Sequence, residues 1–429
     1  MKCKHIKLIS AILITILFWQ QGVNAHPRQA KAGTPGLLRP MASQERPPGD
    51  LGAMGSLLER RMQYLQLTKA IKALKRRGVK LDKTGMEKKL LEKVYIRSRK
   101  KPGSRIESFH YDILAALFSP VADDGIEHTE GRYIYDIMAK KGLTVPGVDR
   151  VEIDCGGLTL EDIGEGRGTY REVDKVIIIG KDATVVFTAS ADKRDLDVPF
   201  DETDRHSAQE FENLKMLRAC TKLVPEPYGY AERRGRYRVI FREFVEGHDV
   251  GLYVKSFLLS DSPAEQDFMR DIFRAVGNAE GRLYRETGYM PSDNHWGNTV
   301  IQELPGGGIK AGIIDLAEIT NDPDKIAFAL ANGAGQFASK LADKSRLTID
   351  EIADYARCYF QGFCDAFDDR RQSAAMIMRA IPKLRFTISS NPGSSIPVIA
   401  GAIRTVASPK PTALSGIPRP NFSGQLSGI

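Results

Sequence analysis

The spacing of apolar residues predicts strands in one part of the chain and helices in the rest. Apolar residues three and four positions apart predict amphipathic helices within 57–94, 105–145, 207–219, 249–259, 265–287, 325–340 and 348–384. Short apolar runs beside turn residues predict strands at 173–179, 184–188, 237–243, 299–301 and 311–314. Strands therefore concentrate in residues 151–246 and helices in 247–386, which favours an α+β fold.

The first 25 residues have the pattern of a secretory signal peptide. Lys2, Lys4 and Lys7 precede an apolar run at 8–19, and Val23–Ala25 provides small residues for cleavage. The run is short for a bilayer span of about 20 residues, so cleavage is favoured over an uncleaved anchor. We therefore expect a secreted or periplasmic protein. Delivery to a host cell is one destination that agrees with such a signal.

Two further segments lack periodicity. Residues 26–56 are rich in Pro, Gly, Ala and Arg, and residues 391–429 are rich in Pro, Ser and Gly. Such compositions bury little apolar surface, so a disordered linker and a disordered tail are predicted. Four cysteines remain after the signal segment, too few for a disulfide scaffold, and no Cys/His spacing suggests zinc.

The positive charge of the chain is local. The net charge is +8, whereas residues 57–101 alone contain 16 Lys and Arg against 4 Asp and Glu, a net charge of +12. Two interpretations stay open for this basic extension: surface helices with solvated faces, or a docking arm for an anionic membrane or an acidic partner. Tyr64 and Tyr95 are its aromatic residues, so stacking on nucleic acid is not favoured.

The stretch Tyr289–Ile301 carries the candidate chemistry. It follows the helical pattern at 265–287 and places Asp293 five residues before Asn298, in front of an apolar strand. After a Gly-rich turn, a second apolar strand ends at Asp315. Asn and Asp supply the hard oxygen ligands that suit Mg²⁺. The plainer interpretation is an Asx turn at Asp293 and a strand-end cap at Asp315.

This order of helix, loop, strand, turn, strand and Asp resembles the catalytic core of the protein-kinase-like superfamily. The resemblance covers residues 151–384 and implies a two-lobed fold, with an antiparallel β N-lobe at 151–246 and a mainly helical C-lobe at 247–386. A basic helical extension at 57–145 would precede it. The resemblance further implies that Asp293 orients an acceptor hydroxyl, and that Asn298 and Asp315 hold Mg²⁺ on the phosphates of ATP.

The same resemblance assigns nucleotide contacts in the N-lobe. Gly164, Gly166 and Gly168 would form the loop over the phosphates, although their spacing is one residue shorter than in the family. Glu243 and Phe244 would lie in the hinge, where the backbone would bond the adenine edge.

The lysine that the family places on its third strand is missing, because Thr188 occupies that position. Lys193 and Lys175 are the candidate replacements. Glu210 would be the helix carboxylate that pairs with this lysine, and Glu212 is the fallback.

Departures around the catalytic Asp favour an atypical branch, similar to aminoglycoside or choline kinases. Pro291-Ser292 precedes Asp293, His295 follows it, and Leu316 follows Asp315 where the family usually has Phe. His295 is either a structural hydrogen-bonding residue or an acceptor-side ligand. We expect an exported kinase that transfers the γ-phosphoryl of ATP to a protein or small-molecule hydroxyl. A catalytically dead scaffold and an AMP transferase are the alternatives.

Overall fold

The computed structural model describes residues 53–81, 85–98, 106–119, 133–155, 171–192, 206–233, 237–257, 262–306, 308–344, 347–386 and 392–407. The predicted signal peptide and nearly all of the predicted linker lie outside these ranges. The chain divides into a unit at Met1–Glu59 and a second, larger unit at Arg60–Ile429.

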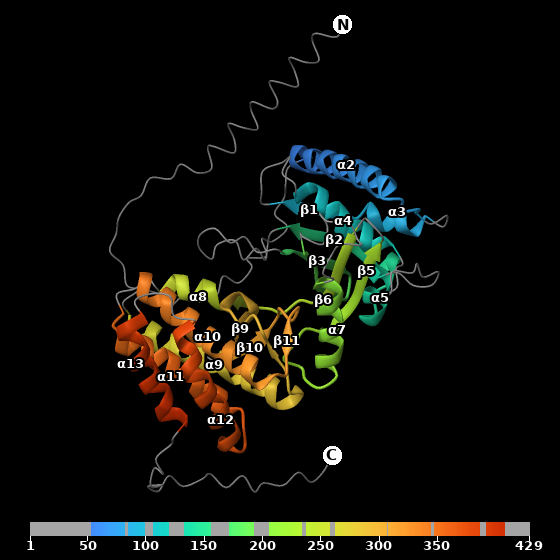
Figure 1. The fold of residues 1–429 in the computed structure, drawn as a ribbon. Helices are drawn as coiled ribbons and strands as arrows, with labels where there is room; N and C mark the ends of the chain where they lie inside the picture. The colour runs from blue at the N-terminus through green and yellow to red at the C-terminus, as the bar shows by residue number, and fades with distance from the viewer. Residues whose placement is uncertain are drawn as a thin grey trace, which may run out of the picture. The chain divides into compact units, whose positions relative to one another are not determined.

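A six-stranded sheet forms the first half of the larger unit, with helices beside it (Figure 1). The predicted strands β3 and β4 pair as a hairpin, with Ile179 opposite Thr184 at its Gly180-Lys181 turn. Strands β2 to β6 pair antiparallel, as predicted for residues 151–246, whereas β1 lies earlier in the chain and runs parallel to β2. The strand order is β1-β2-β3-β4-β6-β5, with bounds β1 Val94–Ser98, β2 Val148–Cys155, β3 Arg171–Gly180, β4 Thr184–Asp192, β5 Pro227–Arg233 and β6 Tyr237–Glu243.

Helices that precede residue 145 pack on one face of this sheet. Val176, Phe187 and Phe241 point to this face and pack in one apolar cluster with side chains of these helices, including Leu74. These helices are α2 Ala53–Arg76, α3 Met86–Leu91, α4 Ile106–Phe118 and α5 Tyr133–Lys140. The expectation that Val94 continues a helix is wrong, because its β-branched and aromatic surroundings place it in β1.

The opposite face of the sheet packs against α7, His206–Arg218. The predicted apolar side of this helix is confirmed, because Phe211, Leu214 and Leu217 are all buried. They share a cluster with Ile240 of β6 and with Leu316, which follows the candidate site. This helix therefore packs both on the sheet and on the residue that follows Asp315.

Helices dominate the second half, as predicted. Its main elements are α8 Val250–Phe257, α9 Pro263–Thr287, α10 Pro323–Lys344, α11 Ile349–Asp365, α12 Arg370–Ala380, a 3₁₀ segment η5 at Ile381–Phe386, and α13 Pro392–Ala407. Glycines allow α9 and α11 to cross at close range. A Cβ on Gly277 would lie 1.9 Å from the Tyr359 carbonyl oxygen, and one on Gly362 would lie 1.9 Å from the Arg274 carbonyl oxygen.

The C-terminal end differs from the sequence prediction. The expected disordered tail begins at 391, but α13 occupies Pro392–Ala407, and its Ile399 and Ile403 are fully buried in the helical core. Apolar residues three and four positions apart stabilise this helix despite its Pro- and Ser-rich start. Residues 408–429 lie outside the described part.

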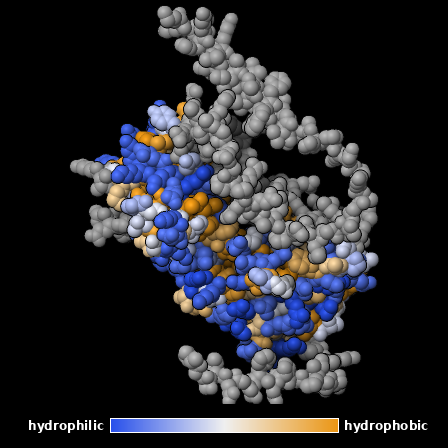
Figure 2. Space-filling model, turned by 180° about the vertical axis from the view of Figure 1, so that it is seen from behind, coloured by the Kyte–Doolittle hydropathy of each residue, from blue (hydrophilic) through white to orange (hydrophobic). Residues whose placement is uncertain are grey.

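The coloured surface is mainly hydrophilic on the face that Figure 2 shows, with smaller groups of apolar residues between the polar ones. Along the described segments, none of the helices has the length and hydropathy needed to cross a bilayer. Cys220, Cys358 and Cys364 are free thiols.

Candidate active site

A short hairpin brings the two predicted metal ligands to one end. The strands β9 (Thr299–Glu303) and β10 (Ile309–Ile313) pair antiparallel, with Thr299 opposite Ile313. Asn298 directly precedes β9, and Asp315 lies two residues beyond β10. The Ile314 amide donates to the Asn298 carbonyl oxygen at 2.9 Å, which extends the pairing to this end. Asn298 and Asp315 therefore leave the same edge of the hairpin.

The loop before β9 presents Asp293 to solvent. Its side chain is 64% exposed, whereas Asn298 is 4% exposed. The Asn298 Nδ2 donates to the Asp293 carbonyl oxygen at 2.8 Å, and the Asn298 amide donates to the His295 carbonyl oxygen at 3.0 Å. One buried asparagine thus holds the backbone of the loop and leaves the Asp293 carboxylate accessible.

His295 has a structural role in this loop. It caps the 3₁₀ helix η4 (Trp296–Asn298), because its Nδ1 accepts from the Gly297 amide at 3.1 Å. Its other ring nitrogen, Nε2, lies 3.7 Å from Asp293 Oδ2. An Nδ1 that accepts carries no proton, so the Nε2–H faces the carboxylate. The His295 ring therefore lies beside the Asp293 carboxylate, and its bond to the Gly297 amide favours the structural interpretation of His295.

A buried polar cluster anchors the loop from beneath. Asn294 donates from Nδ2 to Glu280 Oε2 at 2.8 Å and to the Tyr359 hydroxyl at 3.3 Å, and its carbonyl accepts from Asn332 at 3.1 Å. The Tyr359 hydroxyl also donates to Glu280 Oε2. Burial raises the pKa of Glu280 to about 7, against the lowering effect of these two bonds. Sequence reasoning missed this cluster, which fixes the residue next to Asp293.

Glu210 is fully buried and pairs with an arginine. Arg242 of β6 donates from Nη1 to Glu210 Oε1 at 2.5 Å and, from the same nitrogen, to the Ile314 carbonyl oxygen. Lys175, one of the two predicted partners, instead lies over the Phe244 ring, 4.1 Å from its centroid. The assignment of Lys175 to Glu210 is therefore wrong, because its side chain extends toward the segment after β6. Lys193 lies outside the described residues.

Glu212, the fallback for Glu210, is exposed and pairs with Lys215 at 3.2 Å on the outer side of α7. The structure therefore favours Glu210 as the inward carboxylate of this helix. The two bonds from Arg242 connect β6, α7 and the hairpin end within a few residues of Asp315.

The predicted hinge residues lie at the end of β6. The Glu243 amide already donates to the Glu226 carbonyl oxygen at 2.8 Å, so Glu243 has no amide hydrogen to offer adenine. The Phe244 ring lies beneath the Lys175 ammonium group. The following β7 (His248–Asp249) pairs with β9, with His248 opposite Ile301, and so extends the β9–β10 hairpin by one strand. Gly164, Gly166 and Gly168 lie outside the described residues.

The donor set at the hairpin end suits Mg²⁺. Within the described ranges, no group of three or more His, Cys, Asp or Glu residues could hold a metal ion by itself. Asn298 and Asp315 offer an amide and a carboxylate oxygen, and Mg²⁺ in nucleotide sites commonly takes one or two protein oxygens plus phosphates and waters. These residues therefore fit a cation that arrives with a nucleotide.

The segment between Asp315 and α10 is short, and it pairs with the strand that precedes the Asp293 loop. Asn213 of α7 donates to the carbonyl oxygens of Leu316 at 2.7 Å and Ala317 at 3.1 Å. Then β11 (Ile319–Thr320) pairs with β8 (Met290–Pro291) just before Asp293, and α10 follows from Pro323. The chain therefore returns to the loop at Ile319, soon after Asp315.

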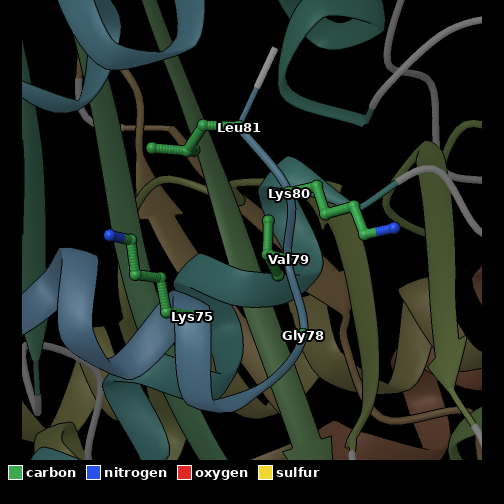
Figure 3. A pocket seen from close by; sticks show the side chains of 5 residues that line it. All are labelled: Lys75, Gly78, Val79, Lys80 and Leu81. Atoms are coloured by element: carbon green, nitrogen blue, oxygen red, sulfur yellow. The ribbon is translucent and has the colours of Figure 1, made fainter.

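A surface hollow elsewhere offers no comparable chemistry. It lies at the turn after α2 and is lined by Lys75, Gly78, Val79, Lys80 and Leu81. Figure 3 shows the Lys75 and Lys80 side chains pointing away from each other. Val79 packs in the cluster on the sheet face opposite Arg242, so this hollow is separate from the candidate active site.

Similarity to known proteins is found among solved structures. No protein-family profile matches the chain, and no curated protein is similar to it. Among solved structures, WaaP in complex with acyl carrier protein is 13% identical with a TM-score of 0.27, and the match covers 56% of this chain and 86% of that one. The maize sucrose-induced receptor kinase 1 kinase domain, bound to AMP-PNP, is 11% identical with a TM-score of 0.28, covering 62% and 97%. Because both TM-scores are low, neither similarity is evidence for the function of this chain.

Proposed function

We propose that this chain is an atypical kinase that transfers the γ-phosphoryl group of ATP to a hydroxyl acceptor. The observation that carries the proposal is the hairpin end, where Asn298 and Asp315 leave one edge and the held loop presents an exposed Asp293. The two parts of the fold, the sheet with its helices and the helical second half, would correspond to the two lobes of a kinase.

The candidate residues would have different roles in phosphoryl transfer. Asp293 would orient the acceptor hydroxyl and take its proton. The acceptor oxygen would form a bond to the γ-phosphorus while the bond from that phosphorus to the β,γ-bridging oxygen breaks, which releases ADP. Asn298 and Asp315 would hold Mg²⁺, whose positive charge neutralises the phosphates when it is bound.

The short segment after Asp315 supports a small-molecule or otherwise atypical acceptor. A protein substrate usually needs an extended surface beside the catalytic loop, whereas here β11 returns to β8 directly after Leu316 and Ala317. A small alcohol would reach the exposed Asp293 carboxylate without such a surface. A protein hydroxyl remains a candidate acceptor for the assay below.

Transfer from ATP labelled at the α or the γ phosphate tests the proposal. The full chain is incubated with Mg²⁺, labelled ATP and a panel of alcohols and protein acceptors, with Asp315→Ala as the inactive comparison. Transfer of the γ label that disappears in Asp315→Ala supports a kinase. Transfer of the α label would replace it with AMP transfer. ATP binding without any transfer, across the whole panel, would favour a pseudokinase scaffold.

We also infer export from the Met1–Ala25 pattern. The supporting features are the three early lysines, the apolar run and the small residues at Val23–Ala25. N-terminal sequencing of the protein recovered from an expressing cell should give His26 as the first residue. Recovery of the intact chain beginning at Met1 would contradict this inference.

A further inference from the structure

The buried pair of Glu210 and Arg242 has no counterpart in the sequence prediction, which places a lysine there. Arg242 is 6% exposed and Glu210 is fully buried. Burying two charges is costly unless they are paired and hydrogen-bonded, and such pairs are often no more stabilising than apolar residues. Stability alone therefore gives little reason for this pair, which lies close to the hairpin end.

The sheet register explains how an arginine reaches the lysine position. Thr188 of β4 stands where the resemblance expects the lysine, and it pairs directly with Arg242 of β6 and with Lys175 of β3. Directly paired residues in antiparallel strands project from the same face of the sheet. Arg242 therefore projects from the same face as Thr188, where the resemblance expects the lysine, one strand away.

The guanidinium retains unused donors. Both bonds that Arg242 makes within the described ranges leave from Nη1, one to Glu210 and one to the Ile314 carbonyl oxygen. A guanidinium has five N–H donors in a fixed fork, so Nε and Nη2 remain available to a phosphate oxygen. Burial lowers the pKa of Arg242 while the nearby charge of Asp315 raises it, and arginine keeps its proton in proteins.

We propose that Arg242 is the phosphate-binding cation of this site, held by Glu210 and by the Ile314 carbonyl in place of a strand lysine. The inference rests on the proposed function, since it assigns a contact to the same nucleotide. It makes β6, rather than β4, the strand that carries the cation. It also connects the cation physically to the metal-ligand end, because the Ile314 amide bonds Asn298 and its carbonyl bonds Arg242.

Calorimetric binding of ATP and of adenosine to the full chain separates this role from a structural one. The central variant is the double change Glu210→Met and Arg242→Met, which removes both charges of the pair together, so we expect it to fold. Adenosine affinity should stay at the wild-type value. ATP affinity should fall roughly 10- to 100-fold, the usual effect of losing a hydrogen bond to a charged group.

Three single variants complete the test. Arg242→Lys keeps a cation and should retain part of the ATP preference over adenosine. This single variant replaces the double variant as the test if the double variant is unstable. Lys181→Met, at the exposed β3–β4 turn, is the matched control and should bind ATP as the wild type does. Lys193→Met tests the rival lysine and should leave the ATP preference in place.

Two outcomes would overturn the inference while leaving the kinase proposal intact. One is a double variant that binds ATP as tightly as the wild type, with γ-phosphoryl transfer preserved. The other is loss of the ATP preference in Lys193→Met but not in the double variant. If the wild type itself binds no ATP, the proposed function fails and this inference fails with it.

Discussion

The Glu280→Gln variant removes an ionisable group from the interior and keeps its shape. Glu280 is fully buried, with a pKa raised from 4.5 to about 7 because burial disfavours the charged form. Both of its hydrogen bonds end on Oε2, from Asn294 and Tyr359, so the oxygen of a glutamine can accept both. The variant therefore isolates the effect of the charge from the effect of the contacts.

The sign and size of the effect follow from proton linkage. Between pH 4.5 and 7 the folded chain holds a proton at Glu280 that the unfolded chain has released, so stability falls as pH rises through this range. At roughly 1.4 kcal/mol per unit, a pKa difference between 4.5 and about 7 corresponds to about 3 kcal/mol. Most of it, about 2.5 kcal/mol, is lost between pH 5 and pH 8.

Urea unfolding at several pH values measures this difference. The free energy of unfolding of the wild type should fall relative to that of Glu280→Gln as pH rises from 5 to 8, which leaves the variant more stable at pH 8. Asp271→Asn, an acid-to-amide change at an exposed position of the same helix, should follow the wild type. Parallel pH profiles for the wild type and Glu280→Gln would refute the reasoning, because the buried carboxyl would then titrate alike in both states.

Two packing predictions concern the helical second half. Gly277→Ala should lower the free energy of unfolding by several kcal/mol or prevent folding, since its Cβ would lie 1.9 Å from the Tyr359 carbonyl oxygen. Gly401→Ala in α13 meets no atom within 4 Å and should raise stability by up to about 1 kcal/mol, measured by urea unfolding. Ile403→Ala should cost about 2–5 kcal/mol because the side chain is fully buried, whereas Arg404→Ala beside it is exposed and should change stability by less than about 0.5 kcal/mol. Equal stability of the two glycine variants, or of the Ile403 and Arg404 variants, would contradict the packing described here.

Local patterns predicted the helix and strands around Asp293 well. The helix before Asp293, the two strands around the Gly-rich turn, and the positions of Asn298 and Asp315 depend on residues close together in the sequence. The hairpin then necessarily brings Asn298 and Asp315 to one end. Periodicity likewise predicted the inward side of α7 and the helices of the second half.

Long-range pairs were not predictable in the same way. Arg242 meets Glu210 only because β6 lies next to β4, which the sequence does not state. A signal was present, however, because Arg242 shares the inward face of its strand with Ile240, a position where a charge requires a partner. Glu280 gives the same signal, since it lies one turn after the buried Val276 on the apolar face of α9.

The C-terminal prediction failed for a compositional reason. Pro392, Ser394 and Ser395 dominate the start of α13 and conceal the apolar spacing that continues to Ile403. The helix is stabilised by burial against α11 rather than by its own propensity. Composition alone therefore could not separate this helix from the residues that follow it.

The Mg²⁺ dependence of ATP binding tests whether Asp315, at the end of the β9–β10 hairpin, holds the metal that accompanies ATP. Calorimetric titrations of the full chain with ATP, with and without Mg²⁺, would be compared between the wild type and Asp315→Asn. We predict that Mg²⁺ tightens ATP binding to the wild type. In Asp315→Asn this Mg²⁺-dependent increase in affinity should be smaller by on the order of tenfold or more, and the affinity for metal-free ATP should change little. An equal Mg²⁺ effect in both proteins would show that the hairpin end does not hold the metal, and the assignment of Asp315 would be wrong.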